Sequence, residues 1–407
     1  MTGALSNIRV LDLSRVLAGP VCTQILGDLG ADIIKVERPG EGDDTRKWGP
    51  PYLLDENGAP TSESAYYLSA NRNKRSLAVD ITTTEGQEII HALLEKSDVM
   101  IENFKVGGLD KYGLGWTSIQ KRHPHIICAS ITGFGHTGPL ASEPGYDLMV
   151  QAMGGMMAIT GEPGGQPMKI GVALSDVMTG LYATIGILAA LNARKETGKG
   201  QHVDVALLDC TLAGLTNLAQ YYLTSGTVAK RQGNAHATIV PYQAFEAADG
   251  WMVIAVGNDT QFKRLATALG HAEWADDERF ARNQARVKHR DILVPMIESA
   301  MKTRSVESWV SLCRDIDVPA GPVNKMDQVF AMAQVDARAM NIEMNHPLSP
   351  TPIHLVGSPL KLSDTSVDYR LPPPICGEHT RDILQSLLQM DDADIQALMT
   401  RNIVDQH

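Results

Sequence analysis

Short apolar segments alternate with helical patterns along the first third of the chain. Strand patterns fall at residues 8–13, 33–37, 76–80, 99–102 and 125–131, and helical patterns lie between them, for example at 19–30 and 84–96. Strands joined by helices at this spacing pair in parallel through right-handed crossovers. We therefore predict an α/β fold with a doubly wound parallel sheet.

The first strand–helix–strand unit lacks the glycine fingerprint of a dinucleotide-binding fold. Glu37 ends the second strand, as an acidic residue does in such folds, but the loop after the first strand reads Leu17-Ala18-Gly19-Pro20. This is not G-x-G-x-x-G, and Pro20 removes an amide that such a loop would use. We therefore exclude a nicotinamide cofactor.

Polar and basic residues follow several of the predicted strands. Ligands of doubly wound sheets bind beyond the C-terminal ends of the strands, where Arg38, Asn103 and the loop 133–139 lie. A guanidinium at such an edge suits a phosphate, although a solvated surface arginine fits the same pattern. Other basic residues near these ends favour an anionic ligand and a solvated face about equally. They are Arg72, Lys74, Arg75, Lys105 and Lys111.

A glycine followed by a long apolar helix pattern runs from Gly171 to Leu191. Apolar residues recur there at three- and four-residue steps, which predicts one buried helix face. These residues are Met178, Leu181, Ile185 and Leu188. Ser175 and Asp176 lie where the helix should start. Asp176 is therefore either a helix cap or a carboxylate that the helix N-terminus keeps ionised and directs at a substrate carbonyl.

The length of 407 residues suggests two domains or one elaborated domain. The composition changes near Gly226, and a Pro-rich extended tract follows Met326. We predict that residues 1–225 form most of a large domain and that residues 226–325 form a smaller α+β domain. Residues 326–407 should then return to the large domain or cover a partner subunit, because a tract of that length lacks a core of its own.

The charge and cysteine content exclude several classes of protein. The net charge of −11 argues against a nucleic-acid partner. The five cysteines are scattered without a C-x-x-C pair, so we expect no metal site and no disulfide framework. The chain shows no charge-free apolar run of bilayer length and no signal-peptide pattern, so we expect no membrane partner and a cytoplasmic location.

Distinctive short motifs run along nearly the whole chain. They are the segments 9–12, 17–20, 30–37, 42–46, 73–76, 102–104, 145–147, 175–176 with 179–180, and 377–380. Together they resemble the class III, or CaiB/BaiF-type, coenzyme A-transferases. The resemblance implies a large Rossmann-like domain built from both chain ends, a small domain, and a homodimer of two interlocked subunits.

The resemblance also implies the residues of the site. Asp176 falls on the catalytic aspartate of the family, which favours the nucleophile over the cap. Lys111 lies where the family often has arginine. Lysine keeps the positive charge but lacks the forked guanidinium group of arginine. His236 and Arg46 are candidates for reading the distal carboxylate of the substrate. The residues that fall on coenzyme A contacts are Val16, Leu17, Ala18, Arg38, Val79, Asp80, Asn103, Phe104, Lys111, Gly145, Tyr146 and Asp147.

By this resemblance, the chain transfers coenzyme A from an acyl-CoA to a free carboxylic acid through an aspartyl-CoA thioester. The strings at 42–46, 48–51 and 236–245 favour dicarboxylates, such as a succinyl-CoA donor and a glutarate acceptor. Coenzyme A and its thioester are then substrates, and we expect no permanently bound cofactor and no metal.

Two other functions fit the same family or fold. The α-methylacyl-CoA racemases carry a histidine where this chain has Tyr146, and tyrosine is a poor base near neutral pH. If the chain were a racemase, it would therefore lack the second acid/base group of the reaction. A non-catalytic protein that binds coenzyme A is the other alternative.

Overall fold

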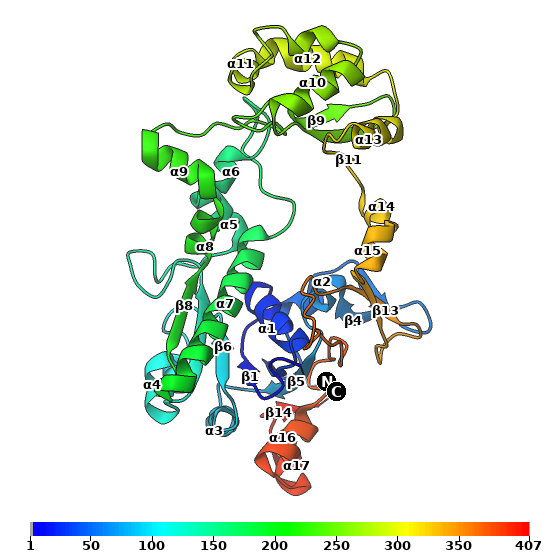
Figure 1. Cartoon of the computed structure of the whole chain (residues 1–407). Helices are drawn as coiled ribbons and strands as arrows, with labels where there is room; N and C mark the ends of the chain where they lie inside the picture. The colour runs from blue at the N-terminus through cyan, green and yellow to red at the C-terminus, as the bar shows by residue number, and fades with distance from the viewer. Residues whose placement is uncertain (1–2, 407) are drawn as a thin grey trace. The chain divides into compact units, whose positions relative to one another are not determined.

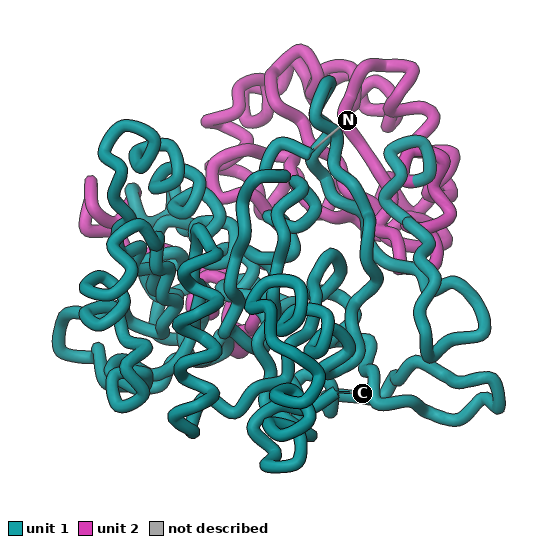
Figure 2. The backbone as a smooth tube through the Cα atoms, turned by 90° about the horizontal axis from the view of Figure 1, so that it is seen from below, with its two compact units in different colours: residues 1–156, 170–220, 336–407 teal, residues 157–169, 221–335 magenta. Residues whose placement is uncertain are grey.

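The computed structural model describes residues 3–406, which form two compact units (Figures 1 and 2). Unit 1 contains the chain up to Met156, Ile170–Gln220 and the chain from Asp336 onward, and unit 2 contains Met157–Lys169 and Tyr221–Val335. The predicted boundaries were 225/226 and 325/326. The segment 157–169 was not expected to join the smaller unit.

Unit 1 is built on a seven-stranded sheet with the order β14-β5-β2-β1-β6-β7-β8. All neighbours pair in parallel except β14, which lies antiparallel to β5 at one edge. The predicted parallel sheet is therefore confirmed, and the order of its parallel strands is that of Rossmann folds. The strands are β1 (Arg9–Asp12), β2 (Asp32–Glu37), β5 (Lys74–Val79), β6 (Val99–Glu102), β7 (Ile127–Thr132), β8 (His202–Ala206) and β14 (Val404–Asp405).

Helices cover both faces of this sheet, because successive side chains of each buried strand point to opposite sides. Val10 packs toward one helix layer and Leu11 toward the other. The first layer holds α1 (Ala18–Asp28), α5 (Asp147–Met153), α7 (Leu174–Thr197) and α8 (Leu207–Gly214). The second holds α3 (Thr84–Leu94), α4 (Trp116–Arg122), α16 (Thr380–Leu388) and α17 (Asp392–Thr400), so the C-terminal segment completes the core of unit 1.

The remaining elements of unit 1 are short. Two antiparallel hairpins pair β3 with β4 and β12 with β13, the second inside the tract that the sequence predicted to be extended. Their bounds are β3 (Tyr52–Leu54), β4 (Pro60–Ser64), β12 (Asn341–Met344) and β13 (Ile353–Val356), and the short helix α2 spans Ala65–Leu68. The 3-10 turns η1 and η2 span Asp44–Lys47 and Asp110–Tyr112.

Unit 2 has its own α+β core, in which Phe245, Phe262 and Trp309 are buried. Its three-stranded sheet has the order β11-β10-β9. Its elements are β9 (Tyr242–Glu246), β10 (Trp251–Ala255), β11 (Ala320–Pro322), α10 (Asp259–Ala268), η3 (Ala272–Ala275), α11 (Asn283–Lys288), α12 (Arg290–Met301), α13 (Val306–Asp315) and α14 (Met326–Phe330). Three short helices cross the unit boundaries, namely α6 (Met156–Ile159), α9 (Thr216–Ser225) and α15 (Ala333–Ala337).

The buried face of α7 is not the one that the apolar spacing predicted. Leu181 is 46% exposed and Ile185 is 61% exposed, whereas the small residues Gly180 and Ala183 are buried. The reason is a close approach to α1, because a Cβ on Gly180 would lie 2.7 Å from the carbonyl oxygen of Ala18. Small side chains allow this approach, so the larger apolar residues point outward.

Helix α7 is also the one helix within residues 3–406 that is long and apolar enough to cross a membrane. A buried core helix passes the same test. Ala183 and Ile187 of α7 lie in the core with residues of α1 and β7.

The contact between Gly180 and α1 predicts a loss of stability on substitution. Gly180→Ala should lower the free energy of unfolding by about 1–3 kcal/mol, because the new methyl group meets backbone that cannot move aside. Chemical denaturation measures this change. Gly321→Ala is the control, since a Cβ there meets nothing within 4 Å, and an equal loss in both variants would contradict the packing explanation.

Candidate active site

The parallel strand order creates a crevice between the loops that follow β1 and β6. The chain leaves β1 toward β2 on one side, whereas β6 leads to β7 on the other side. Open α/β sheets bind ligands at such a switch point, beyond the C-terminal ends of the strands. Asn103 joins the two loops, because its amide oxygen accepts a hydrogen bond from the Arg15 N–H and its amide nitrogen donates to the Arg15 carbonyl.

A cavity of about 640 Å³ lies at this switch point and contains Asp176. Most of the residues predicted to contact coenzyme A line it. These are Val16, Leu17, Ala18, Asn103, Phe104, Lys111, Gly145, Tyr146 and Asp147. Trp48, which is not among the predicted coenzyme A contacts, also lines this cavity.

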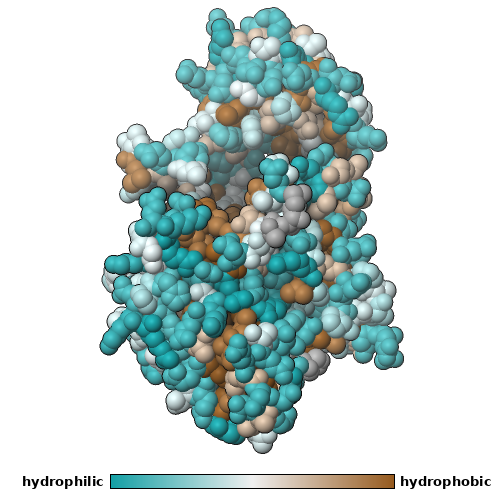
Figure 3. All heavy atoms as spheres, turned by 60° about the horizontal axis from the view of Figure 1, so that its bottom comes forward, coloured by the Kyte–Doolittle hydropathy of each residue, from teal (hydrophilic) through white to brown (hydrophobic). Residues whose placement is uncertain are grey.

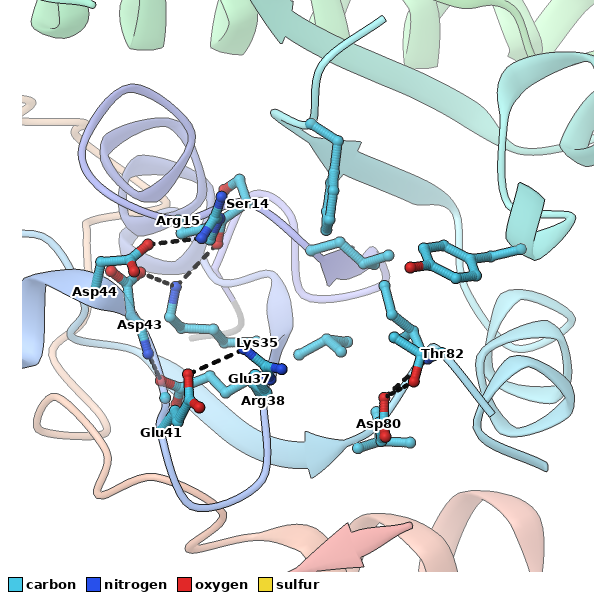
Figure 4. A pocket seen from close by; sticks show the side chains of 17 residues that line it. Ser14, Arg15, Lys35, Glu37, Arg38, Glu41, Asp43, Asp44, Asp80 and Thr82 are labelled. Atoms are coloured by element: carbon cyan, nitrogen blue, oxygen red, sulfur yellow. Dashed lines mark hydrogen bonds and ion pairs between the residues drawn. The ribbon is translucent and has the colours of Figure 1, made fainter. Parts of the chain in front are cut away.

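A second cavity, of about 330 Å³, lies beyond the ends of β2 and β5 and contains the other predicted contacts, Arg38, Val79 and Asp80 (Figure 4). Arg38 forms an ion pair with Glu41 at 3.1 Å, and both side chains are largely exposed. The two cavities share lining residues, namely Arg15, Asp44, Phe104 and Tyr112. The structure thus brings every predicted coenzyme A contact into two adjoining cavities, while their binding role stays a prediction.

A buried ion pair supports the loop that follows β1, whose residues line both cavities. The ammonium of Lys35 lies 2.8 Å from a carboxylate oxygen of Asp43, and both side chains are shielded from water. Lys35 also donates to the carbonyl of Ser14, and the backbone N–H of Val16 lies 3.3 Å from both oxygens of Asp43. Val16 has a φ of +72°, which is strained for a β-branched residue. The ion pair therefore lies beneath the one strained residue of this loop.

Arg46 does not face either cavity, contrary to its predicted role with the substrate. Its guanidinium is buried and donates to Glu37, Glu63, the Tyr67 hydroxyl and the carbonyl of Pro374. All of its N–H groups are therefore taken by the protein. Arg46 ties the loop after β2 to the C-terminal segment and leaves no donor for a ligand.

The basic residues at the start of β5 also have structural partners. Arg72 pairs with Asp28, Lys74 lies near Asp12, and Arg75 pairs with Asp32. These residues lie at the N-terminal end of their strand, whereas ligands bind beyond the C-terminal ends. Lys105 and Lys111 do line the larger cavity.

Asp176 lies in the first turn of α7 but does not cap it. The N-cap position is Ala173, which makes no side-chain capping hydrogen bond. The carboxylate of Asp147 takes this role from the start of α5, because its Oδ1 accepts the backbone N–H of Ser175 at 2.9 Å. The structure therefore removes the capping explanation for Asp176.

The electrostatic environment of Asp176 differs from the expected one. Burial, and then the negative charge of Asp147, raise the pKa of Asp176 to about 7. The expectation that the helix N-terminus simply keeps this carboxylate ionised is therefore wrong. The charges of Asp176 and Asp147, after burial itself, also raise the pKa of Tyr66, which packs edge-on against Trp48.

His236, the other substrate candidate, belongs to unit 2. Its ring packs against Tyr242, and its Nδ1 accepts the backbone N–H of Thr238 at 3.2 Å. Its contact with a substrate stays a prediction. No group of three or more metal-ligating side chains occurs within residues 3–406.

Comparison with known proteins identifies the class. Residues 5–380 match CoA-transferase family III. The succinate–glutarate CoA-transferase of Agrobacterium fabrum is 47% identical over 383 residues, which cover 94% of this chain and 95% of that protein. The succinyl-CoA:glutarate CoA-transferase of Homo sapiens is 43% identical over 403 residues, which cover 99% of this chain and 90% of that protein.

A solved structure has the same fold. The crystal structure of a CaiB/BaiF family protein from Brucella suis is 47% identical, with a TM-score of 0.86 over 95% of this chain and 100% of that chain. The chain therefore belongs to CoA-transferase family III. It is an enzyme, a CoA-transferase.

The ion pair beneath the cavities predicts a pH-dependent contribution to stability. The Lys35 ammonium and the hydrogen bonds of Thr45 outweigh burial and lower the pKa of Asp43 to about 2. Its contribution is present above about pH 4 and is lost as the pH falls toward 2, because the folded state holds the carboxylate ionised. Asp43→Asn should therefore lower the free energy of unfolding by about 3 kcal/mol at pH 7 and by much less near pH 2.

Urea unfolding at the two pH values measures the difference. The neighbouring Asp44→Asn is the control, because Asp44 pairs with Arg15 at the surface and should change the free energy of unfolding by less than about 1 kcal/mol. A loss in Asp43→Asn that does not depend on pH would contradict the assignment.

Proposed function

We propose that this enzyme transfers coenzyme A from succinyl-CoA, or another dicarboxyl-CoA, to a free dicarboxylic acid such as glutarate. Two relatives that are 43% and 47% identical over nearly the whole chain are named for these acids. The observation that carries the catalytic part of the proposal is that the half-buried side chain of Asp176 lines the same cavity as most of the predicted coenzyme A contacts.

The two adjoining cavities suit the two parts of an acyl-CoA. The nucleotide part would occupy the smaller cavity, where the exposed guanidinium of Arg38, which pairs with Glu41 at the surface, can also reach a phosphate. The pantetheine arm would pass Phe104, which lines both cavities, and bring the thioester toward Asp176.

The chemistry would proceed through the carboxylate of Asp176. Its oxygen attacks the thioester carbonyl, so that a mixed anhydride forms and coenzyme A leaves as a thiolate. The thiolate then attacks the Asp176 carbonyl, which gives an aspartyl-CoA thioester and releases the donor acid. The acceptor acid reverses both steps, so the activation of the acyl group is never lost to water.

The raised pKa of Asp176 determines how the rate of the first covalent step depends on pH. Only the ionised carboxylate is a nucleophile, and the pKa of Asp176 is about 7 in the free enzyme. The first covalent step should therefore accelerate as the pH rises through 7.

A homodimer forms part of the proposal, as does a cytoplasmic location. The neighbouring helices α5, α7 and α8 of unit 1 carry exposed apolar side chains, and large exposed apolar patches mark protein interfaces. They include Leu148, Met153, Leu181, Ile185 and Leu212. Figure 3 shows that much of the visible surface is hydrophilic and that hydrophobic residues are exposed in separate patches. A second copy of the chain would cover such a patch.

Replacement of the nucleophile tests the mechanism. Wild-type enzyme incubated with succinyl-CoA should gain the mass of coenzyme A less one water on the peptide that contains Asp176, and Asp176→Ala should lose activity by about a thousandfold or more. Mass spectrometry and a transfer assay with glutarate measure the two effects.

Asp209→Asn is the matched control, because Asp209 lies in the first turn of α8 and is exposed. It should keep activity close to that of the wild type. Activity of Asp176→Ala near the wild-type level would rule out the mechanism. Deuterium exchange at the α-carbon of a 2-methylacyl-CoA, without transfer to any acid, would instead indicate a racemase.

Arg38 tests the placement of the nucleotide. Arg38→Ala should raise KM for succinyl-CoA roughly tenfold and leave kcat nearly unchanged, because the contact lies far from the reacting carbonyl and is the same in ground and transition states. Steady-state kinetics measure both constants. Arg122→Ala, which removes an exposed arginine paired with Glu88 on the second helix layer, should change neither. A fall in kcat with unchanged KM for Arg38→Ala would contradict this placement.

A further inference from the structure

The carboxylate of Asp147 is fixed in place beside the start of α7. Its Oδ1 accepts the backbone N–H of Ser175 at 2.9 Å, and its Oδ2 accepts the side-chain amide of Gln151 at 2.8 Å. Gln151 is fully buried, and its own oxygen accepts the backbone N–H of Ile170 at 3.0 Å. Both donors to Asp147 are neutral amides, so they hold its negative charge in place without cancelling it.

This fixed charge acts on the neighbouring Asp176. Ser175, which donates to Asp147, directly precedes Asp176 in the chain, and both aspartates line the larger cavity. Burial and Asp147 are the two influences that shift the pKa of Asp176 upward. The other charged groups that line the cavity are Arg15, Asp44, Lys105, Lys111 and Glu143, and the Tyr66 hydroxyl lies within the field of both aspartates.

We propose that Asp147 is a positioning residue that favours the covalent intermediate, because its fixed negative charge destabilises the Asp176 carboxylate relative to the uncharged aspartyl-CoA thioester. This inference rests on the proposed function, in which Asp176 is the nucleophile. It also gives Asp147 a role other than the coenzyme A contact that the sequence predicted.

The charge balance of the half-reaction explains the effect. The Asp176 carboxylate and the acyl-CoA thioester become an aspartyl-CoA thioester and a free acid anion, so the negative charge leaves the enzyme with the acid. Repulsion between the two aspartates is present before this step and absent after it. The charge of Asp147 thus raises the equilibrium constant for loading coenzyme A onto Asp176, without changing the overall equilibrium between the two acids.

Two variants separate this role from helix capping. Asp147→Asn removes the charge but keeps the shape and an oxygen that can accept the Ser175 N–H. Asp147→Glu keeps the charge but displaces the acceptor. If the charge matters, the first variant is more severely affected, and if only the capping of α7 matters, the second is more severely affected.

The experiment measures the loading equilibrium directly. Wild type and both variants are incubated with succinyl-CoA and succinate at several fixed ratios at pH 7.5, and the fraction carrying coenzyme A is read by intact-protein mass spectrometry. We expect the loading constant of Asp147→Asn to fall roughly tenfold, the change that corresponds to one pKa unit, and that of Asp147→Glu to stay closer to the wild type. The acid limb of the loading rate should also move to lower pH in Asp147→Asn, because Asp176 then ionises more readily.

The outcomes distinguish the two proposals. If the wild type never carries coenzyme A, the covalent mechanism itself fails, and this inference fails with it. If the wild type loads normally and Asp147→Asn has the same loading constant and pH profile, only the role of Asp147 is overturned. Thermal unfolding checks that each variant is folded, and Asp147→Ser, which also removes the charge and keeps a capping oxygen, replaces Asp147→Asn if that variant does not fold.

Discussion

The close contact between α7 and the start of α1 determines where Asp176 lies. Helix α1 begins directly after the loop that follows β1, and Gly180 brings α7 against the carbonyl of Ala18. Asp176 lies one helical turn before Gly180, so this packing holds its carboxylate beside the switch point of the sheet. Larger residues at the contact would push Asp176, the proposed nucleophile, away from the loop with which it shares a cavity.

Two aspartates of the same unit show how the environment shifts the pKa of one residue type in opposite directions. Asp43 lies against the ammonium of Lys35, and its pKa is lowered to about 2. Burial and then the negative charge of Asp147 raise the pKa of Asp176 to about 7. The first aspartate therefore stabilises the strained loop at Val16, and the second is the residue to which the proposed mechanism gives the role of nucleophile. Opposite shifts of one residue type are how a single fold assigns structural and catalytic duties.

Much of the fold follows from local patterns in the sequence. Alternating strands and helices predicted the parallel sheet, because each buried strand is a short apolar run bounded by helix signals. The buried face of α7 could not be predicted. Periodicity shows where the large apolar side chains of a helix lie, but it does not show which face of the helix packs against the core. Gly180 was the one signal for the true contact, because a glycine inside a helix often marks a close approach.

The residues of the site were predicted with less success than the fold, and mainly through the resemblance to a family. The rule that ligands bind beyond the C-terminal ends of parallel strands placed Arg38 and Asn103 correctly. The same rule misplaced Lys74, which lies at the start of its strand. Arg46 was misjudged because charge alone does not reveal that Glu37 and Glu63 lie around it. Asp147 lies 28 residues before Ser175, which it caps, and no local pattern relates the two.

The fate of the acceptor oxygen tests the central claim most directly. Glutarate labelled with ¹⁸O in both carboxyl groups, added to enzyme already loaded with coenzyme A, should leave one label on the carboxylate of Asp176 after a single turnover. The peptide that contains Asp176 would then be heavier by about 2 Da for each labelled oxygen. An unlabelled Asp176 after complete formation of glutaryl-CoA would contradict a covalent role for this residue.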